Sequence, residues 1–305
     1  MPTYRFRIVN VFAGEDLLTP TALSGNPLCV FEDARGLGEG EMMALTRQFN
    51  LSETTFLLPP SDPSSGANAR LRIFNPTQDR RLAEMPFAGH PTLGSAYVCG
   101  QLQGIAGGVT LELPAGLVPV ESHGDIRTLT APFQGEPQIH EEVLPARHVA
   151  EMLGLDEADL AGPPVWVDTG IEQFLVPLIS DEAVRKASPG TPPSGDWPLS
   201  RSGRSNAYVF AFPGKTIDLR EQVSARFFVK APGSGLYEDP GTGSACANLG
   251  GWLLQTRSGS AASVRVAQGR EMERPCQLLL DVTATGKVRV GGRVVEVANG
   301  TVTLP

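Results

Sequence analysis

The sequence predicts an α+β fold made of two similar halves, each with a mostly antiparallel sheet around one long helix. Three observations favour this fold. Short apolar and β-branched segments, typical of strands, outnumber the segments with helical periodicity. One segment in each half has the length and small residues of a packed helix. Landmark residues also recur in the same order along the two halves, and the length of 305 residues suits two domains of about 150 residues each.

The first half begins with an alternating segment and contains one amphipathic helix. Met42, Met43, Leu45 and Phe49 have the spacing of a helix with one apolar face, and a polar turn at residues 50–53 ends it. A second helix, rich in small residues, is expected with Pro91 in its first turn. The predicted strands are 4–12, 28–31, 54–58 and 70–74, and the predicted helices are 40–49 and 91–99.

The second half has a similar pattern of predicted strands and helix. Its expected helix is again rich in small residues, and a long loop of Pro, Gly and Ser precedes the middle strands. Glycine turns separate the three strands expected at the end of the chain. The predicted strands are 165–167, 174–179, 207–212, 225–229, 288–290, 294–297 and 302–304, and the predicted helix is 244–255.

An internal repeat is the most informative feature of the sequence. Residues 89–96 read GHPTLGSA and residues 238–245 read EDPGTGSA, which agree at four positions and place His90 opposite Asp239. Upstream, Arg-Ile-Phe at 72–74 matches Arg-Phe-Phe at 226–228. Further upstream, Glu53 before one strand matches Asn206 before another. Three landmarks in one order indicate a duplicated domain.

Composition excludes several classes of protein. The net charge is −8, from 25 basic and 33 acidic residues, which argues against a nucleic-acid partner. No apolar run is long enough to span a membrane, and the first residues do not form a signal peptide, so we expect a cytoplasmic protein. The four cysteines and four histidines show no metal-ligand spacing, so we expect no metal. The segment 241–246 lacks the third glycine of a dinucleotide motif, so we expect no cofactor.

Two like halves facing each other predict a cleft with a helix start from each half pointing into it. Helix starts carry unpaired N–H groups and partial positive charge, which favour a small carboxylate-bearing ligand. Gly89 and Gly243 allow the backbone to approach such a ligand closely. Thr242 and Ser244 offer hydroxyl groups. The plainer interpretation is that both segments are only tight helix starts.

Glu53, His90 and Asp239 are the candidate catalytic residues, and each has an alternative role. Glu53 suits a general acid/base if it is partly buried, and otherwise is a carboxylate at a helix end or in a turn with Ser52. His90 suits a second acid/base or a hydrogen-bond donor, because imidazole titrates near neutral pH, or else it caps its helix. Asp239 suits orientation of a substrate amine or hydroxyl, and also suits an N-cap. Ser244 is alternatively bonded to backbone within its own turn.

Five ordered sequence blocks resemble the phenazine-biosynthesis PhzF-like isomerases, which share the diaminopimelate epimerase fold. The blocks are SGNPLCVF at 24–31, NLSETTFLLPP at 50–60, FAGHPTLGSAY at 87–97, EDPGTGSACANL at 238–249 and AQGREMERP at 267–275. They span about 250 residues in the family's order. A single block, such as the GTGSA segment, would be a weak signal, but the ordered set is specific.

The resemblance implies two pseudo-symmetric halves, with residues 1–125 and the returning segment 291–305 in the first and residues 126–290 in the second. It implies a homodimer and a cofactor-free proton shuttle in which Glu53 matches the catalytic acid/base. Gly89, His90, Asp239 and Ser244 match other active-site positions; the related epimerases instead use two facing cysteines, which the matching turns here lack. The function expected is an isomerase that moves a proton on a small carboxylate. The alternatives are a two-base epimerase or racemase, and a non-catalytic ligand-binding or interaction protein.

Overall fold

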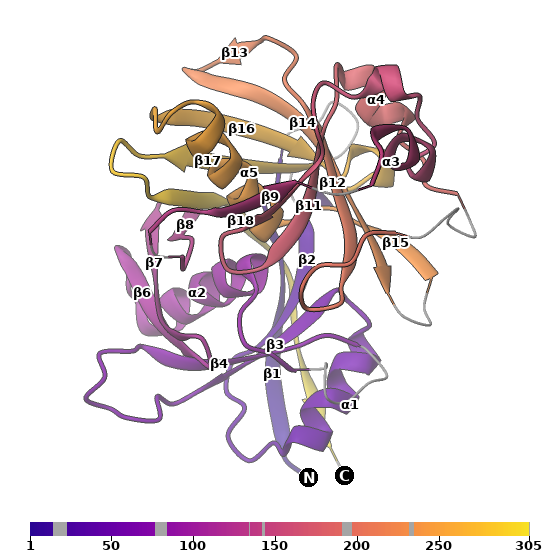
Figure 1. The fold of residues 1–305 in the computed structure, drawn as a ribbon. Coiled ribbons are helices and arrows are strands. Elements are labelled where there is room, and N and C mark those ends of the chain that lie inside the picture. Colours follow the sequence, from indigo (N-terminus) through magenta and orange to yellow (C-terminus); the bar gives the residue numbers. More distant parts are fainter. Residues whose placement is uncertain are drawn as a thin grey trace. The chain divides into compact units, whose positions relative to one another are not determined.

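The computed structural model divides the chain into two units (Figure 1). Unit 1 is Met1–Thr130 with Gly291–Pro305, and unit 2 is Ala131–Val290. The residues that the structure describes are 1–14, 23–76, 84–133, 135–141, 144–190, 197–231 and 235–304. The expected boundary lay after residue 125, with 291–305 assigned to the first half.

The described residues of unit 1 form a mixed sheet and two α-helices. Two strand pairs are parallel, β2-β3 and β4-β6. The antiparallel pairs are β1-β2, β3-β4, β4-β5, β6-β7 and β7-β8. The last strand of the chain, β18, pairs antiparallel with β1, and residues 288–290 at its start belong to unit 2. The elements are β1 (Thr3–Val11), β2 (Asn26–Phe31), α1 (Glu39–Phe49), β3 (Glu53–Leu58), β4 (Ala69–Phe74), β5 (Glu84–Met85), α2 (Gly89–Gln103), β6 (Gly108–Leu113), β7 (Gly116–His123), β8 (Ile126–Thr130) and β18 (Val288–Thr303).

Unit 2 follows the same plan. The strands β11 and β12 pair in parallel, as do β14 and β16, and β10-β11, β12-β14, β14-β15 and β16-β17 are antiparallel. The elements are β9 (Gln138–Glu141), α3 (Ala146–Met152), η3 (Glu157–Asp159), β10 (Val165–Asp168), β11 (Glu172–Pro177), α4 (Asp181–Lys186), β12 (Ser205–Ala211), β13 (Thr216–Ile217), β14 (Arg220–Ala231), β15 (Gly235–Asp239), α5 (Gly243–Thr256), β16 (Ala262–Gln268), η4 (Arg270–Met272) and β17 (Cys276–Val282).

The order and direction of strand pairing confirm the predicted repeat. The series β1-β2-β3-β4-β5-α2-β6-β7 corresponds, element by element, to β10-β11-β12-β14-β15-α5-β16-β17. Register agrees as well, because Phe74 lies opposite Glu84 in unit 1 and Phe228 lies opposite Glu238 in unit 2. Each unit is therefore a version of one supersecondary arrangement.

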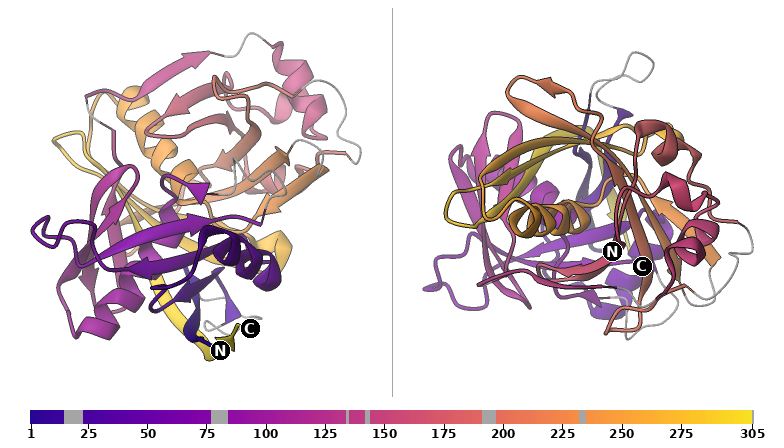
Figure 2. Two further views of the ribbon diagram at one scale, coloured as in Figure 1. Left: turned by 90° about the horizontal axis from the view of Figure 1, so that it is seen from below. Right: turned by 45° about the horizontal axis from the view of Figure 1, so that its top comes forward.

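One long helix packs against the strands of each unit, as predicted. Helix α2 contacts β1, β2, β3, β4, β6 and β8, and α5 contacts β10, β11 and β17 (Figure 2). Small residues permit this close packing. A Cβ atom on Gly94 would lie 2.6 Å from a Leu28 methyl carbon, and one on Gly250 would lie 2.6 Å from a Val288 methyl carbon. Larger residues there would force the helix and strands apart.

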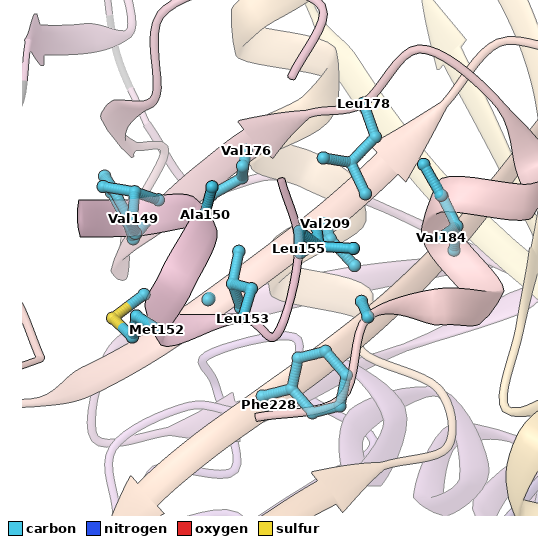
Figure 3. Packing of buried hydrophobic residues seen from close by; sticks show 14 of the residues in the cluster. Val149, Ala150, Met152, Leu153, Leu155, Val176, Leu178, Val184, Val209 and Phe228 are labelled. Carbon is cyan, nitrogen blue, oxygen red and sulfur yellow. The ribbon is translucent and has the colours of Figure 1, made fainter. Parts of the chain in front are cut away.

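Shorter helices cover apolar residues elsewhere in each unit. In unit 1, Met42, Met43 and Leu45 of α1 pack with Phe31 and Phe56 of the strands. In unit 2, α3 and α4 pack against β11, β12 and β14 (Figure 3). The residues labelled there are Val149, Ala150, Met152, Leu153, Leu155, Val176, Leu178, Val184, Val209 and Phe228. The amphipathic pattern predicted for 40–49 is therefore confirmed.

The sequence did not predict the strands β6, β7, β8, β16 and β17 or the helices α3 and α4, and it divided the end of the chain differently from the structure. The three final strands expected from the glycine turns are a single strand, β18, because its backbone stays paired with neighbouring strands, with β8 and, from Val294 to Thr303, with β1. A Cβ atom at Gly300 would lie 2.9 Å from the Phe6 ring, so a larger residue there would push that ring aside. Among the described helices, none combines the length and apolar character needed to cross a bilayer.

Candidate functional site

Glu53 is held at the junction between α1 and β3. Asn50 ends α1 in the left-handed conformation, with φ of 51°, and its N–H donates to the Thr46 carbonyl. The chain then enters β3, whose first residue is Glu53, paired in parallel register with Leu28 of β2. The Glu53 side chain is 16 % exposed. This gives the partial burial that a carboxylate acid/base requires.

His90 lies in the first turn of α2 and faces Glu53. Its Nε2 atom is 3.4 Å from Glu53 Oε2, and its Nδ1 atom is 3.5 Å from Asn26 Nδ2. The helix N-cap is Ala88, so His90 does not cap the helix as one alternative proposed. Burial lowers the pKa of His90 to about 3, while a hydrogen bond to the Pro27 backbone acts in the opposite, raising direction. His90 is therefore neutral near pH 7.

Both ring nitrogens of His90 lie near polar groups. Proline has no N–H, so the Pro27 carbonyl accepts a hydrogen bond and the imidazole donates it. The Asn26 side-chain nitrogen beside Nδ1 can only donate, and a neutral imidazole has one donor and one acceptor nitrogen. Nε2 is buried and faces Glu53 Oε2.

In unit 2, a hydrogen-bonded loop joins β15 to α5. Asp239 is the last residue of β15, and its carboxylate accepts a hydrogen bond from the Thr242 hydroxyl. Gln268 Nε2 donates to the Asp239 carbonyl at 2.8 Å and to Thr242 Oγ1 at 3.1 Å. Thr242 is the N-cap residue of α5. The alternative role of Asp239 as the N-cap is therefore wrong, because β15 extends through Asp239 and the helix begins four residues later.

Gly269, the residue that follows Gln268, lies so close to this loop that a side chain would not fit there. Gly269 has φ of 77°, and a Cβ atom there would lie 2.5 Å from the Pro240 carbonyl and 2.4 Å from the Arg274 carbonyl. An added side chain would collide with backbone on both sides. The Gln-Gly pair of the 267–275 block thus holds the Asp239–Thr242 loop.

Ser244 is the second residue of α5 and is partly exposed. Its Oγ atom accepts a hydrogen bond from Gln173 Nε2 at 2.8 Å. Gln173 lies in β11 and also bonds Asn248, one turn further along α5. The hydroxyl of Ser244 is therefore bonded to another element, and not within its own turn as the alternative interpretation had it.

Sheet register corrects the predicted pairing of His90 with Asp239. Arg72 and Arg226, Glu84 and Glu238, and the helix starts Gly89 and Gly243 are all separated by 154 residues (226 − 72, 238 − 84 and 243 − 89). His90 and Asp239 are 149 residues apart. The position equivalent to His90 is Ser244. The pairing was wrong because Gly94-Ser95-Ala96 lies within α2, whereas Gly243-Ser244-Ala245 begins α5.

The cysteines of the two central helices are buried and form no disulfides. Burial raises the pKa of Cys99 to about 11 and raises that of Cys246 further above its ordinary value. Such thiols remain protonated near neutral pH and suit packing. In the described part of the chain, no group of three or more His, Cys, Asp or Glu side chains is arranged to hold a metal ion.

Four buried amides at or near the candidate residues were not predicted from the sequence. Asn26, Gln173 and Gln268 contact candidate residues, and Asn248 contacts Gln173. Asn26, Asn248 and Gln268 fall in the sequence blocks 24–31, 238–249 and 267–275, which offered a signal without a role. Gln173 lies beside Glu172 at the start of β11, ahead of the predicted strand 174–179, and no sequence signal marked it.

Comparison with known proteins shows one family along almost the whole chain. The model of the PhzC-PhzF family, described as "Phenazine biosynthesis-like protein", matches residues 15–300. An uncharacterized isomerase of Pasteurella multocida is 34 % identical, over 99 % of this chain and 95 % of that protein. The chain belongs to the phenazine biosynthesis-like family.

Two further members of the family support the fold and the class of activity. The trans-2,3-dihydro-3-hydroxyanthranilate isomerase of Pseudomonas aeruginosa is 29 % identical, over 97 % of this chain and 98 % of that protein. The crystal structure of a PhzF-family phenazine biosynthesis protein of Bacillus anthracis aligns over all of both chains, with a TM-score of 0.80 and 22 % identity. The predicted α+β, diaminopimelate epimerase-like fold is confirmed, and the chain is an isomerase of the phenazine biosynthesis-like family. The expected meeting of Glu53, His90 and Asp239 in one site stays a prediction.

Proposed function

We propose that this isomerase moves a proton on a small carboxylate-bearing substrate, with Glu53 as the general acid/base and no cofactor. The observation that carries the proposal is the pairing of Glu53 Oε2 with His90 Nε2 at 3.4 Å. A partly buried carboxylate takes a proton from carbon more readily than an exposed one, because burial disfavours its charged form. The same group then returns the proton to another carbon of the substrate.

His90 supports Glu53 as a neutral hydrogen-bond acceptor. Burial lowers the pKa of His90 and keeps its imidazole neutral near pH 7, so in this proposal it does not act as a cationic second acid. In this proposal Nδ1 donates to the Pro27 carbonyl, and the Nε2 lone pair accepts a hydrogen bond from the carboxyl proton that Glu53 carries after abstraction. This holds the protonated carboxyl in one orientation between the two transfers.

The start of each central helix supplies substrate-binding groups in this proposal. Backbone N–H groups in the first turn of a helix have no partner within the helix and bind carboxylate oxygens. Gly89 begins α2, and Gly243 and Ser244 begin α5. Thr242 is bonded to the carboxylate of Asp239 and orients it for a substrate amine or hydroxyl.

Substitution of Glu53 by Gln tests the proposal. The variant keeps the size and hydrogen bonding of the side chain and removes its basicity. With trans-2,3-dihydro-3-hydroxyanthranilate, the substrate in the name of the P. aeruginosa relative, turnover is expected to fall at least ~10²-fold. Glu84→Gln is the matched control, because Glu84 pairs with Arg72 and should leave turnover within about threefold. An active Glu53→Gln enzyme would sink the assignment.

Heavy water separates a shuttle from a two-base reaction. A single carboxylate that returns the proton it removed leaves part of the substrate hydrogen in the product. Two opposed bases introduce solvent deuterium at every turnover. Mass spectrometry of the product formed in heavy water measures the difference, and full deuterium incorporation would favour the epimerase mechanism.

A homodimer in solution and a cytoplasmic location are part of the same proposal. The homodimer rests on the family resemblance, and the cytoplasmic location rests on the composition and the N-terminal sequence. Sedimentation at micromolar concentration tests the first, and a monomer there would count against it.

A further inference from the structure

A chain of buried amides in unit 2 ends on the hydroxyl of Ser244. Thr169, Gln173 and Asn248 are each at most 4 % exposed. Asn248 lies one turn beyond Ser244 on α5, and Gln173 lies on β11. Because the members are buried, their donors and acceptors must be matched within the protein.

The direction of this chain is fixed by backbone groups. The Thr169 backbone N–H donates to Asn248 Oδ1 at 2.9 Å, and the Thr169 hydroxyl donates to the same atom at 2.6 Å. Asn248 Nδ2 donates to the Ile171 carbonyl at 2.8 Å. A backbone N–H only donates and a carbonyl only accepts, so the Asn248 amide has one possible orientation.

The fixed Asn248 amide then fixes Gln173. Asn248 Nδ2 donates its second proton to Gln173 Oε1 at 2.8 Å. Gln173 must therefore present its nitrogen to Ser244, and Nε2 donates to Ser244 Oγ at 2.8 Å. Within the described residues, Gln173 is the one side chain hydrogen-bonded to Ser244 Oγ. Ser244 accepts from the protein, and its own proton is left to be donated outward.

We propose that Gln173 is a positioning residue that makes Ser244 a hydrogen-bond donor toward the substrate. The inference rests on the proposed function, in which Ser244 binds substrate, and it deepens that function by naming the chemistry recognised. With one lone pair occupied by Gln173, the Ser244 hydroxyl has its proton available for an acceptor such as a carboxylate oxygen. A hydrogen bond to a charged carboxylate is stronger than one to the neutral oxygen of a carboxamide, so the start of α5 favours a carboxylate over the matching carboxamide.

Reversal of the polarity at Gln173 tests this inference. Gln173→Glu keeps the shape and replaces the donating nitrogen by an oxygen that accepts from Ser244, so the Ser244 proton turns inward. The probe is 3-hydroxyanthranilate, compared with its carboxamide, by calorimetric titration. The unmodified protein should prefer the carboxylate, and Ser244→Ala should weaken carboxylate binding about 10- to 100-fold, the range for a hydrogen bond to a charged group.

Three comparisons separate positioning from structural damage or direct charge repulsion. Gln173→Glu should weaken carboxylate binding as much as Ser244→Ala, but should have little further effect in the Ser244→Ala background, whereas repulsion would persist there. At low pH the new carboxyl gains a proton, donates to Ser244 again and should recover binding. Gln173→Met, which introduces no charge, should lose part of the preference for carboxylate over carboxamide.

The outcomes distinguish this inference from the proposed function. Equal affinity of the unmodified protein for carboxylate and carboxamide would overturn it, as would unchanged preference in both Gln173 variants. If Gln173→Glu weakens carboxylate binding equally in the unmodified protein and in the Ser244→Ala background, that result would also overturn the inference. Failure of the proposed function appears elsewhere, as an active Glu53→Gln enzyme.

Discussion

Units 1 and 2 have the same framework, and one ion pair recurs in both. In unit 1 Arg72 pairs with Glu84 at 2.6 Å and lies over the ring of a phenylalanine at 5.0 Å. In unit 2 Arg226 pairs with Glu238 at 2.7 Å and lies over the equivalent ring at 4.8 Å. The pairs sit at equivalent sheet positions, where β4 meets β5 and β14 meets β15. The same ion pair is thus present in both units at the position where it links the two strands.

The two units differ where each central helix begins. Glu53 heads β3 in unit 1, and the equivalent residue in unit 2, Asn206, uses its amide oxygen to accept from the Phe174 backbone N–H at 3.0 Å. His90 in α2 corresponds to Ser244 in α5. At these positions unit 1 has a carboxylate and an imidazole, whereas unit 2 has an amide and a hydroxyl. The repeat therefore places residues at equivalent positions in the two units, and the type of residue at each position determines its chemistry.

The recurring arginines should differ most in their contribution to stability. Arg226→Met is expected to lower the free energy of unfolding by about 3 kcal/mol, and Arg72→Met by about 1 kcal/mol. The side chains of Arg226 and Glu238 are 11 % and 12 % exposed, whereas those of Arg72 and Glu84 are 21 % and 31 % exposed. Arg226→Met would therefore leave an unpaired carboxylate, that of Glu238, in the more buried of the two sites. Arg226 also donates to the Ala187 carbonyl after α4.

Urea unfolding followed by circular dichroism measures these losses. Arg35→Met is the control, because its ion pair with Asp33 is exposed and should contribute almost nothing. Equal losses from Arg72→Met and Arg226→Met would show that burial does not set the difference between the two units.

His90 should make the stability of the protein depend on pH in a way that Ser244 does not. The folded pKa of about 3 lies below the ordinary value of 6.5, so between these values the unfolded state binds a proton that the folded state does not. The stability contribution is therefore fully present above pH 6.5 and falls by about 1.4 kcal/mol per pH unit as pH decreases toward 3.

The variant His90→Gln removes this dependence. The difference in unfolding free energy between the unmodified protein and the variant should therefore shift by that amount per unit between pH 6.5 and 5. Ser244→Ala, at the equivalent position in unit 2, should show a constant difference over the same range. Parallel curves for His90→Gln would mean that His90 is protonated in the folded protein.

The smallest predicted effect concerns the turns that precede β4 and β14. In unit 2, Leu219 adopts φ of 63° and is 93 % exposed, whereas the connection in unit 1 has Gly66 at φ of 80°. Leu219→Gly should raise the free energy of unfolding by about 1 kcal/mol, because glycine adopts this conformation without strain. Gly66→Ala should lower it by a similar amount. Thermal unfolding detects both, and a destabilised Leu219→Gly variant would indicate that the leucine makes a stabilising contact.

The sequence alone was sufficient for much of unit 1 and for the repeat. Met42, Met43 and Leu45 predicted α1 because helical periodicity records which face is buried. Arg72 and Arg226 marked equivalent strands because their residue types and spacing were both retained. The five ordered blocks predicted the family, and Glu53 was singled out with its partial burial.

Tertiary structure alone decided the counterpart of His90, its protonation state and the partners of Ser244. The alignment of residues 89–96 with 238–245 paired His90 with Asp239. The strand register, which depends on contacts distant in sequence, instead pairs His90 with Ser244. The pKa of His90 depends on burial by several elements, so no local pattern encodes it. Gln173 is 71 residues from Ser244 in sequence, and only the packing of β11 against α5 brings their side chains within 2.8 Å. Local interactions determine which elements form, whereas long-range packing determines which polar atoms meet and how strongly each holds its proton.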